Sequence, residues 1–291
     1  MELLSPKNWK EYELLDCGDF EKLERFGTHI LIRPEPQAVW RKQLTESDWH
    51  KAAHWKFVPK SSSSGEWKRL KPSTEQWKIN YILPNGKNIV FRLGLTSFKH
   101  VGIFPEQAVN WELIHSFFVR HKGAKFLNLF AYTGGASLAA KAAGADVTHV
   151  DSIKQVVTWA NENRAASALE DIRWIIDDAL KFVKKEKRRG NIYQGIILDP
   201  PAYGHGPNGE KWKLEENIEE LIAEVTSIVD TKNHLLIFNA YSLGFSALVA
   251  KNLLLPFAGR VNSLLSVGEL FLKAKSGLEL PLGVWGRSEK K

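Results

Sequence analysis

Acidic and amide residues stand at the ends of four successive apolar runs in the middle of the chain. Asn128 belongs to the first run, Asp151 ends the second, Asp177 and Asp178 follow the third, and Asp199 ends the fourth. In an open parallel sheet, ligands bind beyond the carboxyl ends of the strands, near the point where the strand order reverses. Oxygen acceptors at several of these ends therefore predict a ligand site that recognises hydroxyl and amino groups.

A Gly-Gly pair closes the loop over residues 128–135, which joins the first apolar run to a predicted helix. Glycine lets the backbone approach a ligand closely. The N-terminus of the following helix would also favour a negatively charged group, because its N–H groups point outward. The loop therefore predicts a site for a ligand carboxylate, although glycine in such a turn can also have a purely structural role.

Asp151 and Asp178 have the chemistry to recognise a nucleoside. Asp151 lies 23 residues after Asn128, where a carboxylate can accept hydrogen bonds from both ribose hydroxyls. Asp178 can accept a hydrogen bond from an adenine amino group, and the backbone of Ala179 can donate one to the ring. The alternative role for both aspartates is that of a helix N-cap.

The sequence Asp-Pro-Pro-Ala-Tyr, residues 199–203, follows the fourth run. Consecutive prolines remove backbone donors from a strand end and fix a rigid loop whose carbonyls point outward. Such a loop can hold a reacting group in place, and Tyr203 could stack on a planar base. We therefore predict that Asp199, Pro200 and Tyr203 carry the reaction. A rigid turn with a packed tyrosine is the alternative.

These residues need a scaffold that brings the ends of separate strands together. Hydrophobic patterns predict strands over residues 126–130, 147–151, 173–177, 195–199 and 234–239, and helices over residues 136–143, 154–166, 179–188 and 215–229. This alternation is typical of βαβ units and of a parallel sheet covered on both faces. Residues 264–272 and 278–285 predict an antiparallel pair that closes the sheet. The predicted fold class is therefore α/β, with a doubly wound, mostly parallel, seven-stranded sheet.

The N-terminal part differs in composition from the rest. Residues 12–58 mix short apolar runs with prolines and tryptophans, which indicates short strands and turns. Residues 60–65 contain four consecutive serines and predict a flexible linker or loop. We therefore predict a small β-rich module over residues 1–60, a linker and β-hairpin over residues 61–105, and the ligand-binding domain over residues 106–291.

Two further elements are predicted in front of the main domain. Residues 77–83 and 88–93 flank an Asn-Gly pair, which is a strong signal for a β-hairpin. The apolar residues between positions 107 and 121 follow helical spacing and predict a helix that leads into the sheet.

The chain is moderately basic. It has 40 Lys and Arg against 33 Asp and Glu, a formal net charge of +7, and a pI near 9.3. This balance favours a polyanionic partner such as RNA, although the surplus is modest and scattered. The densest basic run, residues 184–189, stands at the end of a predicted helix. Because cations suit the helix dipole there, we predict a structural role for this run.

Location and metal binding can also be judged from the sequence. No window approaches the roughly 18 uninterrupted apolar residues that a membrane span needs, and the N-terminus lacks a signal-peptide core. Cys17 is the only cysteine, which excludes an internal disulfide and a cysteine-based zinc site. We expect a cytoplasmic protein that binds neither membrane nor metal. Its oligomeric state is not indicated.

Five motifs together resemble those of the large-subunit (23S) ribosomal RNA base methyltransferases, which use S-adenosylmethionine. They occupy residues 127–135, 149–151, 160–163, 177–179 and 198–201. The resemblance covers residues 88–285 and implies a Rossmann-like methyltransferase fold, in which an antiparallel pair at the end of the sheet is usual. It also implies RNA methylation during rRNA processing, with S-adenosylmethionine as the cofactor.

Carried over residue by residue, the resemblance implies a cofactor site. The residues that would bind the methionine moiety are Asn128, Phe130, Ala131, Tyr132, Thr133, Gly134 and Gly135. Those that would bind the ribose and the adenine are Asp151, Ser152, Asp178 and Ala179. Asp199 would also contact the cofactor, at the methyl-transfer end that it forms with Pro200.

Two departures from the family pattern bear on the reaction. Glu106 and Ala108 stand where the family usually has Asp and Arg, so the family's cofactor contacts by residues 99–107 do not carry over. Methylation of cytosine C5 needs a cysteine thiolate, which such enzymes carry after the fifth strand, and residues 238–242 contain none. A base nitrogen is therefore the favoured acceptor. Guanine N7, which needs only positioning, ranks slightly above an exocyclic amine because Ala202 separates the prolines from the aromatic residue.

Two other functions stay open at this point. A methyltransferase that acts on a protein or a small molecule would use the N-terminal module as a lid, since residues 12–58 do not clearly match the family's RNA-binding β-barrel. A non-enzymatic RNA-binding protein would leave the acidic series at the strand ends without a purpose. Steeply salt-dependent RNA binding would favour the RNA methyltransferase, and absence of cofactor binding would favour the RNA-binding protein.

Overall fold

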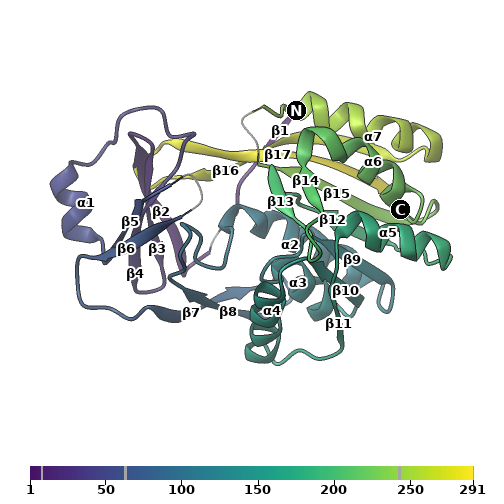
Figure 1. Ribbon diagram of the computed structural model, residues 1–291, viewed down its shortest axis with the longest axis horizontal. Coiled ribbons are helices and arrows are strands. Elements are labelled where there is room, and N and C mark those ends of the chain that lie inside the picture. The colour runs from purple at the N-terminus through teal and green to yellow at the C-terminus, as the bar shows by residue number, and fades with distance from the viewer. Residues whose placement is uncertain (8, 62–63, 242–243, 291) are drawn as a thin grey trace.

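The computed structural model describes residues 1–7, 9–61, 64–241 and 244–290. The chain forms a β-rich part near the N-terminus and a larger α/β part, with the hairpin of β7 and β8 between them (Figure 1). The long strands β16 and β17 run from the α/β part to the β-rich part. Their connection reaches β2, where Lys275 N donates a hydrogen bond to Leu14 O at 2.8 Å.

Within the described residues the large sheet has eight strands, in the order β1-β16-β17-β15-β12-β9-β10-β11. Its central parallel strands are β9 (Lys125–Leu129), β10 (Asp146–Asp151), β11 (Ile172–Ile176), β12 (Gly195–Leu198) and β15 (His234–Ala240). β17 (Glu279–Lys290) runs antiparallel between β15 and β16 (Leu264–Lys273). The chain moves from β9 outward to β11 and then adds β12 and β15 on the other side of β9. The predicted doubly wound fold and its closing antiparallel pair are therefore confirmed.

The sheet has one strand beyond the seven predicted. β1 (Glu2–Leu4) pairs in parallel with β16, where Glu2 lies opposite Gly268. The edge of β16 offers unpaired backbone groups to such a partner. Gly268 permits the close approach, because a Cβ there would lie only 1.8 Å from the carbonyl oxygen of Glu2. The added strand could not be foreseen, since it pairs residues from opposite ends of the chain.

Helices cover both faces of this sheet. They are α2 (Ala108–Arg120), α3 (Gly135–Ala142), α4 (Lys154–Ala166), α5 (Ala179–Arg188), α6 (Leu214–Thr226) and α7 (Ala247–Val261). Buried residues of α2 and α3 share a hydrophobic cluster with Phe126 and Val147. Buried residues of α5, α6 and α7 share another with Leu127 and Val150. Because neighbouring residues of a strand point to opposite faces, each strand contributes to both clusters.

The β-rich part is a five-stranded sheet, as predicted for this end of the chain. Its strands, in spatial order, are β2 (Tyr12–Gly18), β3 (Glu21–Phe26), β4 (His29–Pro34), β5 (Trp55–Pro59) and β6 (Gly65–Arg69). Helix α1 (Glu46–Ala52) covers one face, where the buried Trp49 packs with Leu23 and Ile32.

The serine-rich stretch lies between two paired strands of this sheet. β5 and β6 are antiparallel, with Pro59 opposite Gly65, and Lys60 N donates to Ser64 O at 2.9 Å. Residues 62 and 63 of the predicted linker lie outside the described residues. The five-stranded sheet continues to Arg69, beyond the module boundary predicted at residue 60. The division of the chain into three units stays a prediction.

The two elements predicted in front of the main domain are both present. β7 (Gln76–Ile82) and β8 (Asn88–Gly94) form the hairpin, and the helix is α2, which follows the short 3₁₀ turn η1 (Pro105–Gln107). Trp159 Nε1 of α4 donates to the carbonyl of Arg92 at 2.7 Å and fixes the hairpin to the α/β part. Among the described helices, none has the length and hydropathy to cross a membrane.

Candidate active site

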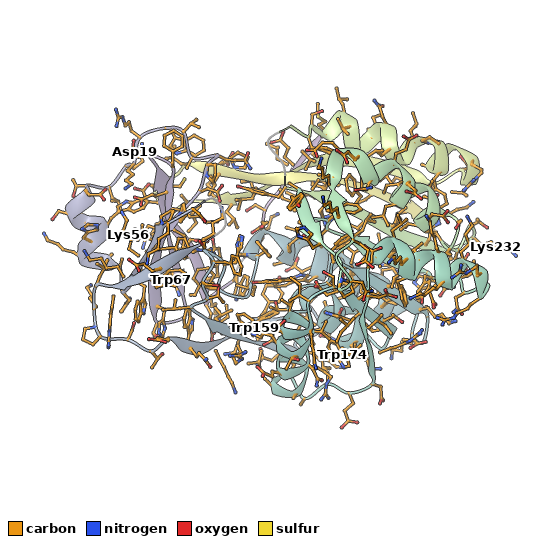
Figure 2. All side chains as sticks on the ribbon, in the orientation of Figure 1. Asp19, Lys56, Trp67, Trp159, Trp174 and Lys232 are labelled. Carbon is orange, nitrogen blue, oxygen red and sulfur yellow. The ribbon has the colours of Figure 1, made fainter. Side chains whose placement is uncertain are left out.

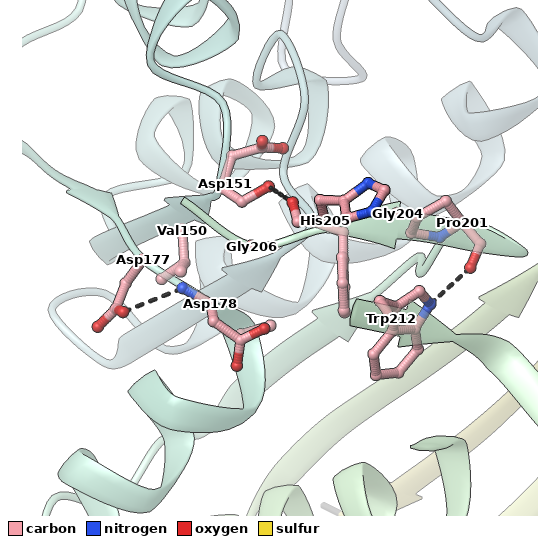
Figure 3. Close-up of a pocket in the computed structure, with 12 residues that line it drawn as sticks. Val150, Asp151, Asp177, Asp178, Pro201, Gly204, His205, Gly206 and Trp212 are labelled. Carbon is pink, nitrogen blue, oxygen red and sulfur yellow. Dashed lines mark hydrogen bonds between the residues drawn. The ribbon is translucent and has the colours of Figure 1, made fainter. Parts of the chain in front are cut away.

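A pocket opens at the carboxyl ends of β10, β11 and β12, beside the point where the strand order reverses (Figure 3). Its wall is formed by Phe130, Val150, Asp151, Ser152, Asp177, Asp178, Ala179, Pro201, Gly204, His205, Gly206 and Trp212. Aromatic and aliphatic side chains form one portion of this wall, and three aspartates form another. Such a wall suits a ligand that has a planar ring and several hydroxyl or amino groups.

Asp151 ends β10 and lines the pocket. Its Oδ2 accepts a hydrogen bond from Tyr132 N (2.9 Å), and its Oδ1 accepts one from Ile153 N (3.0 Å). Burial raises the pKa of this carboxyl, and the backbone donors oppose that rise. Because a carboxylate has further lone pairs, Asp151 is fixed in place and can still accept from two ligand hydroxyls. Helix α4 has Ile153 as its N-cap residue, without a side-chain cap, so the capping alternative for Asp151 is not realised.

Asp178 has the capping role considered for it and also lines the pocket. Its side chain caps α5 by accepting a hydrogen bond from Lys181 N at 2.9 Å, and it also lines the pocket. Asp177, its neighbour, accepts from Asp178 N (3.0 Å) and from Lys185 Nζ (2.6 Å). The cap engages Asp178 Oδ1, so the recognition of an adenine amino group would fall to Oδ2. Ala179 lines the pocket next to it.

The loop after β9 bends sharply. Phe130 (φ 55°), Tyr132 (φ 48°) and Gly134 (φ 91°) all have left-handed backbone conformations. Such conformations cost non-glycine residues energy and are often retained at ligand sites. The ring of Phe130 reaches the pocket and lies 5.1 Å from that of Trp212, centroid to centroid. The strained loop therefore places the ring of Phe130 in the wall of the pocket.

Two predicted residues of this loop have structural partners. Asn128 Nδ2 donates to Ser137 Oγ (2.9 Å), which in turn bonds His149 Nδ1 (3.0 Å), so the amide points into a buried polar cluster. A Cβ at Gly135 would lie 2.6 Å from the ring of Trp111, so packing alone requires glycine at that position. The side chain of Asn128 is thus turned away from the pocket.

The pocket wall contains five of the predicted cofactor residues, namely Phe130, Asp151, Ser152, Asp178 and Ala179. The remaining ones, Asn128, Ala131, Tyr132, Thr133, Gly134, Gly135 and Asp199, are not part of this wall. Most of them belong to the loop between β9 and α3, which adjoins it. Thr133 Oγ1 donates to Gly102 O at 2.6 Å and connects this loop to residues 99–107.

Asp199 is held by a chain of amide side chains that the sequence analysis missed. Its Oδ2 accepts a hydrogen bond from Gln107 Nε2 at 3.1 Å. Gln107 Oε1 accepts from Asn110 Nδ2 (2.7 Å) and from Asn239 Nδ2 (3.4 Å). Asn110 Oδ1 accepts from Arg287 Nη2 at 2.7 Å. Burial raises the pKa of the Asp199 carboxyl to about 7.

Glu106 adds a second buried carboxyl to this region. It is only 6 % exposed and precedes Gln107 in η1. Burial raises the pKa of Glu106 to about 7, the positive charge of Lys22 opposes the rise, and the negative charge of Asp199 adds to it. Two carboxyls that titrate near neutral pH are a frequent feature of sites that handle protons or developing positive charge.

A small hairpin closes one side of the pocket. It consists of β13 (Tyr203–His205) and β14 (Lys211–Lys213). Ser152 Oγ donates to His205 O at 3.1 Å, and Trp212 Nε1 donates to Pro201 O at 2.6 Å (Figure 3). Tyr203 is not part of the pocket wall. It is 54 % exposed, and its hydroxyl contacts His205 Nε2. His205 and Trp212 were not predicted as site residues.

The donor and acceptor set of the pocket fits an adenosine. The aromatic and proline walls can flank a purine ring, and the carboxylates of Asp151 and Asp178 can accept from hydroxyl and amino groups. The sharp loop that ends at Gly134 and the first turn of α3 present backbone N–H groups of the kind that bind carboxylates. The residues present therefore match the nucleoside and amino-acid ends of S-adenosylmethionine.

A doubly wound sheet with an antiparallel strand beside β15, and an acidic pocket where the strand order reverses, are typical of S-adenosylmethionine-dependent methyltransferases. The family model described as S-adenosylmethionine-dependent methyltransferase matches residues 40–247. This match spans more than half of the chain, which therefore belongs to that family. The chain is an enzyme of this class, with S-adenosylmethionine as its cofactor.

Known proteins resemble the chain over different portions. A solved SAM-dependent methyltransferase from Agrobacterium tumefaciens is 35% identical, with a TM-score of 0.92 over 100% of this chain and 94% of the other. The structure of SMU.776, described as a methyltransferase complexed with SAH, shares the fold at 19% identity, with a TM-score of 0.72 over 96% of this chain and 75% of the other.

Curated relatives carry a more specific name. Ribosomal RNA large subunit methyltransferase K/L of Shewanella frigidimarina is 30% identical over 153 residues, which is 51% of this chain and 21% of that protein. The protein of the same name from Pseudoalteromonas atlantica is 34% identical over 134 residues, 45% of this chain and 18% of that protein. The chain thus spans about a fifth of the length of these relatives.

Proposed function

We propose that this methyltransferase transfers a methyl group to a nitrogen of a base in ribosomal RNA. The observation that carries the proposal is the Asp199 carboxyl, which directly follows β12, stands two residues before Pro201 of the pocket wall and is held by Gln107 at 3.1 Å. A methyl group that moves onto a nitrogen creates positive charge there, and a fixed carboxylate stabilises that charge. The carbonyl of Pro200 follows directly in the rigid loop and can accept a hydrogen bond from an exocyclic amine.

The single thiol of the chain supports a nitrogen acceptor over cytosine C5. Cys17 lies in β2 of the β-rich part, and its side chain is fully buried. Burial raises the pKa of this thiol to about 11, so it stays protonated at neutral pH. C5 chemistry needs a thiolate that can reach the base. Residues 238–242, where such a cysteine would follow the fifth strand, contain none; of these, residue 242 lies outside the described residues.

Within the cofactor site we assign each side chain by its chemistry. S-adenosylmethionine supplies an electrophilic methyl group when it is bound. Asp151 and Ser152 bind the ribose, and Asp178 and Ala179 bind the adenine. The loop over residues 128–135, with Phe130, Ala131, Tyr132, Thr133 and the glycine pair, binds the methionine moiety through its backbone. Asp199 and Pro200 orient the acceptor, and Tyr203 provides a ring on which a base can stack.

RNA is the favoured substrate for two reasons. The curated relatives are named for ribosomal RNA of the large subunit, and the chain carries a formal charge of +7. An enzyme that modifies ribosomal RNA would act in the cytoplasm, without membrane or metal. In this proposal the five-stranded sheet of β2 to β6 is the β-rich module, the segment from its end to residue 105 connects it, and residues 106–291 bind the cofactor. Guanine N7 ranks slightly ahead of an exocyclic amine as the acceptor.

The test is methyl transfer from labelled S-adenosylmethionine to RNA, protein and metabolite fractions of cells that lack this protein. We expect label in large ribosomal RNA, and nucleoside mass spectrometry should identify a nitrogen-methylated base. Label in 5-methylcytidine would contradict the nitrogen acceptor. Label confined to the protein or metabolite fraction would contradict the RNA substrate.

A further inference from the structure

The basic surplus of the chain is concentrated in one segment. Residues 51–100 contain ten Lys and Arg but only two Asp and Glu, a surplus of eight. The whole chain has a net charge of +7, so the remaining residues together are close to neutral. The surplus that seemed scattered along the sequence therefore belongs to the end of α1, to β5 and β6, and to the β7–β8 hairpin.

Two antiparallel strand pairs in this segment place like charges directly opposite each other. Lys56 lies opposite Lys68 in the β5–β6 pair, and Lys78 lies opposite Arg92 in the β7–β8 pair. Such pairs share one face of the sheet and cost rather than add stability, by up to about 1 kcal/mol each. Two of them in neighbouring hairpins are not explained by folding.

One member of each pair has a carboxylate partner and the other does not. Lys56 contacts Glu21 at 2.8 Å, and Arg92 contacts Glu162 at 2.6 Å. Lys68 and Lys78 are exposed, and in the part of the chain that the structure describes no carboxylate lies within 4.0 Å of either ammonium group. These two charges are available to an external anion.

The basic run on α5 behaves differently. Lys184 and Lys187 each contact a glutamate of α6, at 2.5 and 2.8 Å. These lysines therefore connect α5 to α6, in line with the structural role predicted for the run. Because they are paired with carboxylates, we do not assign them to a docking surface.

Lys51, at the C-terminus of α1, is a third exposed cation, and a contact with Lys71 places it near the end of β6. Lys71 Nζ donates to the carbonyls of Ala52 (3.3 Å) and Lys51 at the C-terminus of α1, where a cation stabilises the helix. This contact brings residue 71, two positions after the end of β6, against Lys51. Lys51 itself is exposed, and no described carboxylate pairs with it. We call Lys51, Lys68 and Lys78 the basic strip.

On the opposite face of β6 from Lys68, a series of contacts leads from Trp67 to the cofactor loop. Trp67 Nε1 of β6 donates to Thr96 O at 2.8 Å, which holds the segment after β8 against β6. Phe98 in that segment is 54 % exposed. Four residues further, Gly102 O accepts the hydrogen bond from Thr133. Phe98 is therefore an exposed ring on the segment that contacts the cofactor loop, and such a ring offers a stacking platform for a base.

We infer that the basic strip binds the phosphate backbone of the RNA substrate and directs the strand past Phe98 towards Asp199. This inference rests on the proposed function, because it takes RNA as the substrate. Lysines with free ammonium groups bind phosphates as point charges, independently of sequence. Base recognition is left to the groups near Asp199.

The test compares two triple variants that remove the same number of charges. The first carries Lys51→Gln, Lys68→Gln and Lys78→Gln. The control carries Lys122→Gln, Lys232→Gln and Lys251→Gln, three exposed lysines of the α/β part. Lys232 lies at the opposite end of the molecule from Lys56, as Figure 2 shows. The probe is a fluorescent single-stranded RNA of about 30 nucleotides, longer than the roughly 4 to 16 nucleotides that one small fold covers.

Each phosphate contact contributes about 0.7 to the slope of log affinity against log salt for a single strand. The strip variant should lose about 2 from this slope, and its Kd near 0.1 M salt should rise at least about tenfold. The control should keep the slope of the parent protein. Affinity for S-adenosylmethionine should be the same in all three proteins, which also serves as a check of folding.

The RNA methylation of the parent and the salt slope of the strip variant together distinguish failure of this inference from failure of the proposed function. If the parent methylates RNA while the strip variant keeps the parent's salt slope, the strip is not the docking surface and the proposed function stands. If the strip and control variants lose the same RNA affinity and the same salt slope, the strip is not the docking surface. If the parent neither binds nor methylates RNA but binds vesicles of anionic phospholipid through the strip, both conclusions are wrong.

Discussion

At the scale of single residues, Asp151 is the side chain whose geometry and predicted role agree most closely. Backbone amides of Tyr132 and Ile153 hold its two oxygens, and the carboxylate faces the pocket. We expect Asp151→Asn to weaken S-adenosylmethionine binding by about 1.5 to 3 kcal/mol, the usual range for hydrogen bonds to a charged group. Calorimetric titration measures the change. An unchanged affinity in a variant with a normal unfolding transition would contradict the ribose assignment.

Asp199 should make the reaction depend on pH. Because its pKa is raised to about 7, the carboxylate predominates only above neutral pH, and single-turnover methyl transfer should rise between about pH 6 and 8. Asp199→Asn should reduce the rate at least about 100-fold at pH 8, the scale lost when reacting groups are misplaced. Full activity in this variant would mean that the acceptor binds elsewhere.

The same pKa predicts a gain in stability from Asp199→Asn. The native state holds the proton of Asp199 up to about pH 7, whereas an unfolded aspartate releases it near pH 3.9. Stability therefore falls as pH rises from about 4 to 7, because the folded protein binds the proton more tightly. The variant should have a higher Tm than the parent at pH 8, and the difference should vanish near pH 4. Thermal unfolding at the two pH values, with Asn110→Asp as a matched control that adds rather than removes charge, measures this.

Glu106 should determine the pH at which the rate of methyl transfer rises. Its own pKa is raised by burial and by the charge of Asp199, and interaction between two titrating groups is reciprocal. Glu106→Gln removes the neighbouring negative charge, so the apparent pKa of methyl transfer should move to lower pH. Single-turnover rates across the pH range measure the midpoint. A shift to higher pH, or none in a folded variant, would show that the two carboxyls are not coupled.

Residues of the pocket wall could be predicted from the sequence where they follow a strand directly. Asp151, Asp178 and Ala179 were found in this way, because the ends of parallel strands meet at one edge of the sheet. Gln107 and Asn239 could not be found, since Gln107 contacts Asp199 from 92 residues before it along the chain, and Asn239, 40 residues after Asp199, contacts Gln107. The side chain of Asn128 lies within β9 and points into the core instead, where Ser137 binds it.

At the scale of elements, the β13–β14 hairpin couples the pocket to the Asp-Pro-Pro loop. Trp212 packs on Phe130 and donates to Pro201 O, whereas Tyr203 on the same hairpin is exposed. Trp212→Ala should therefore weaken S-adenosylmethionine binding by at least about 1 kcal/mol, for one lost hydrogen bond and its packing. Tyr203→Ala should leave cofactor affinity unchanged and weaken RNA binding by about 1 to 3 kcal/mol, for one lost stacking contact. Titrations with each ligand separate the two effects, and a reversed pattern would contradict the roles given to these side chains.

The regular elements of the sheet could be predicted because apolar strands and amphipathic helices alternate with clear periods. Four elements had no comparable signal. Helix α7 is interrupted by Pro256, which disfavours a helix on local grounds, and its apolar residues pack on β16 and β17 instead. β13 and β14 have three residues each, too few for a pattern. β1 depends on a partner at the other end of the chain.

At the scale of the whole molecule, buried charged residues of the β-rich part contact the α/β part through Tyr241 and the segment after β8 through Lys99. Lys22 of β3 contacts Glu35 at 3.1 Å, and Glu35 also accepts a hydrogen bond from Tyr241 at the end of β15. Arg33 of β4 pairs with Glu24 at 2.6 Å and donates to Lys99 O at 3.2 Å. Long-range pairs of this kind cannot be predicted from local patterns. They argue that the β-rich part is fixed in place rather than attached as a loose lid.

Glu35→Gln tests this fixed arrangement. Burial alone would raise the pKa of Glu35, but the positive charge of Lys22 and the hydrogen bond from Tyr241 lower it, so the carboxylate is the native form. Removing that charge leaves Lys22 buried with its main partner gone, which should cost about 3 to 5 kcal/mol. Tyr241→Phe, which removes only the hydrogen bond, should cost about 1 to 3 kcal/mol.

Urea unfolding of the parent and both variants measures these costs. In the parent, stability should also fall as pH drops through the lowered pKa of Glu35, because protonation there removes the same charge. Below that pH the parent and Glu35→Gln should unfold at similar urea concentrations. If Glu35→Gln instead unfolds like the parent at pH 7, the Glu35 charge does not hold the β-rich part in place.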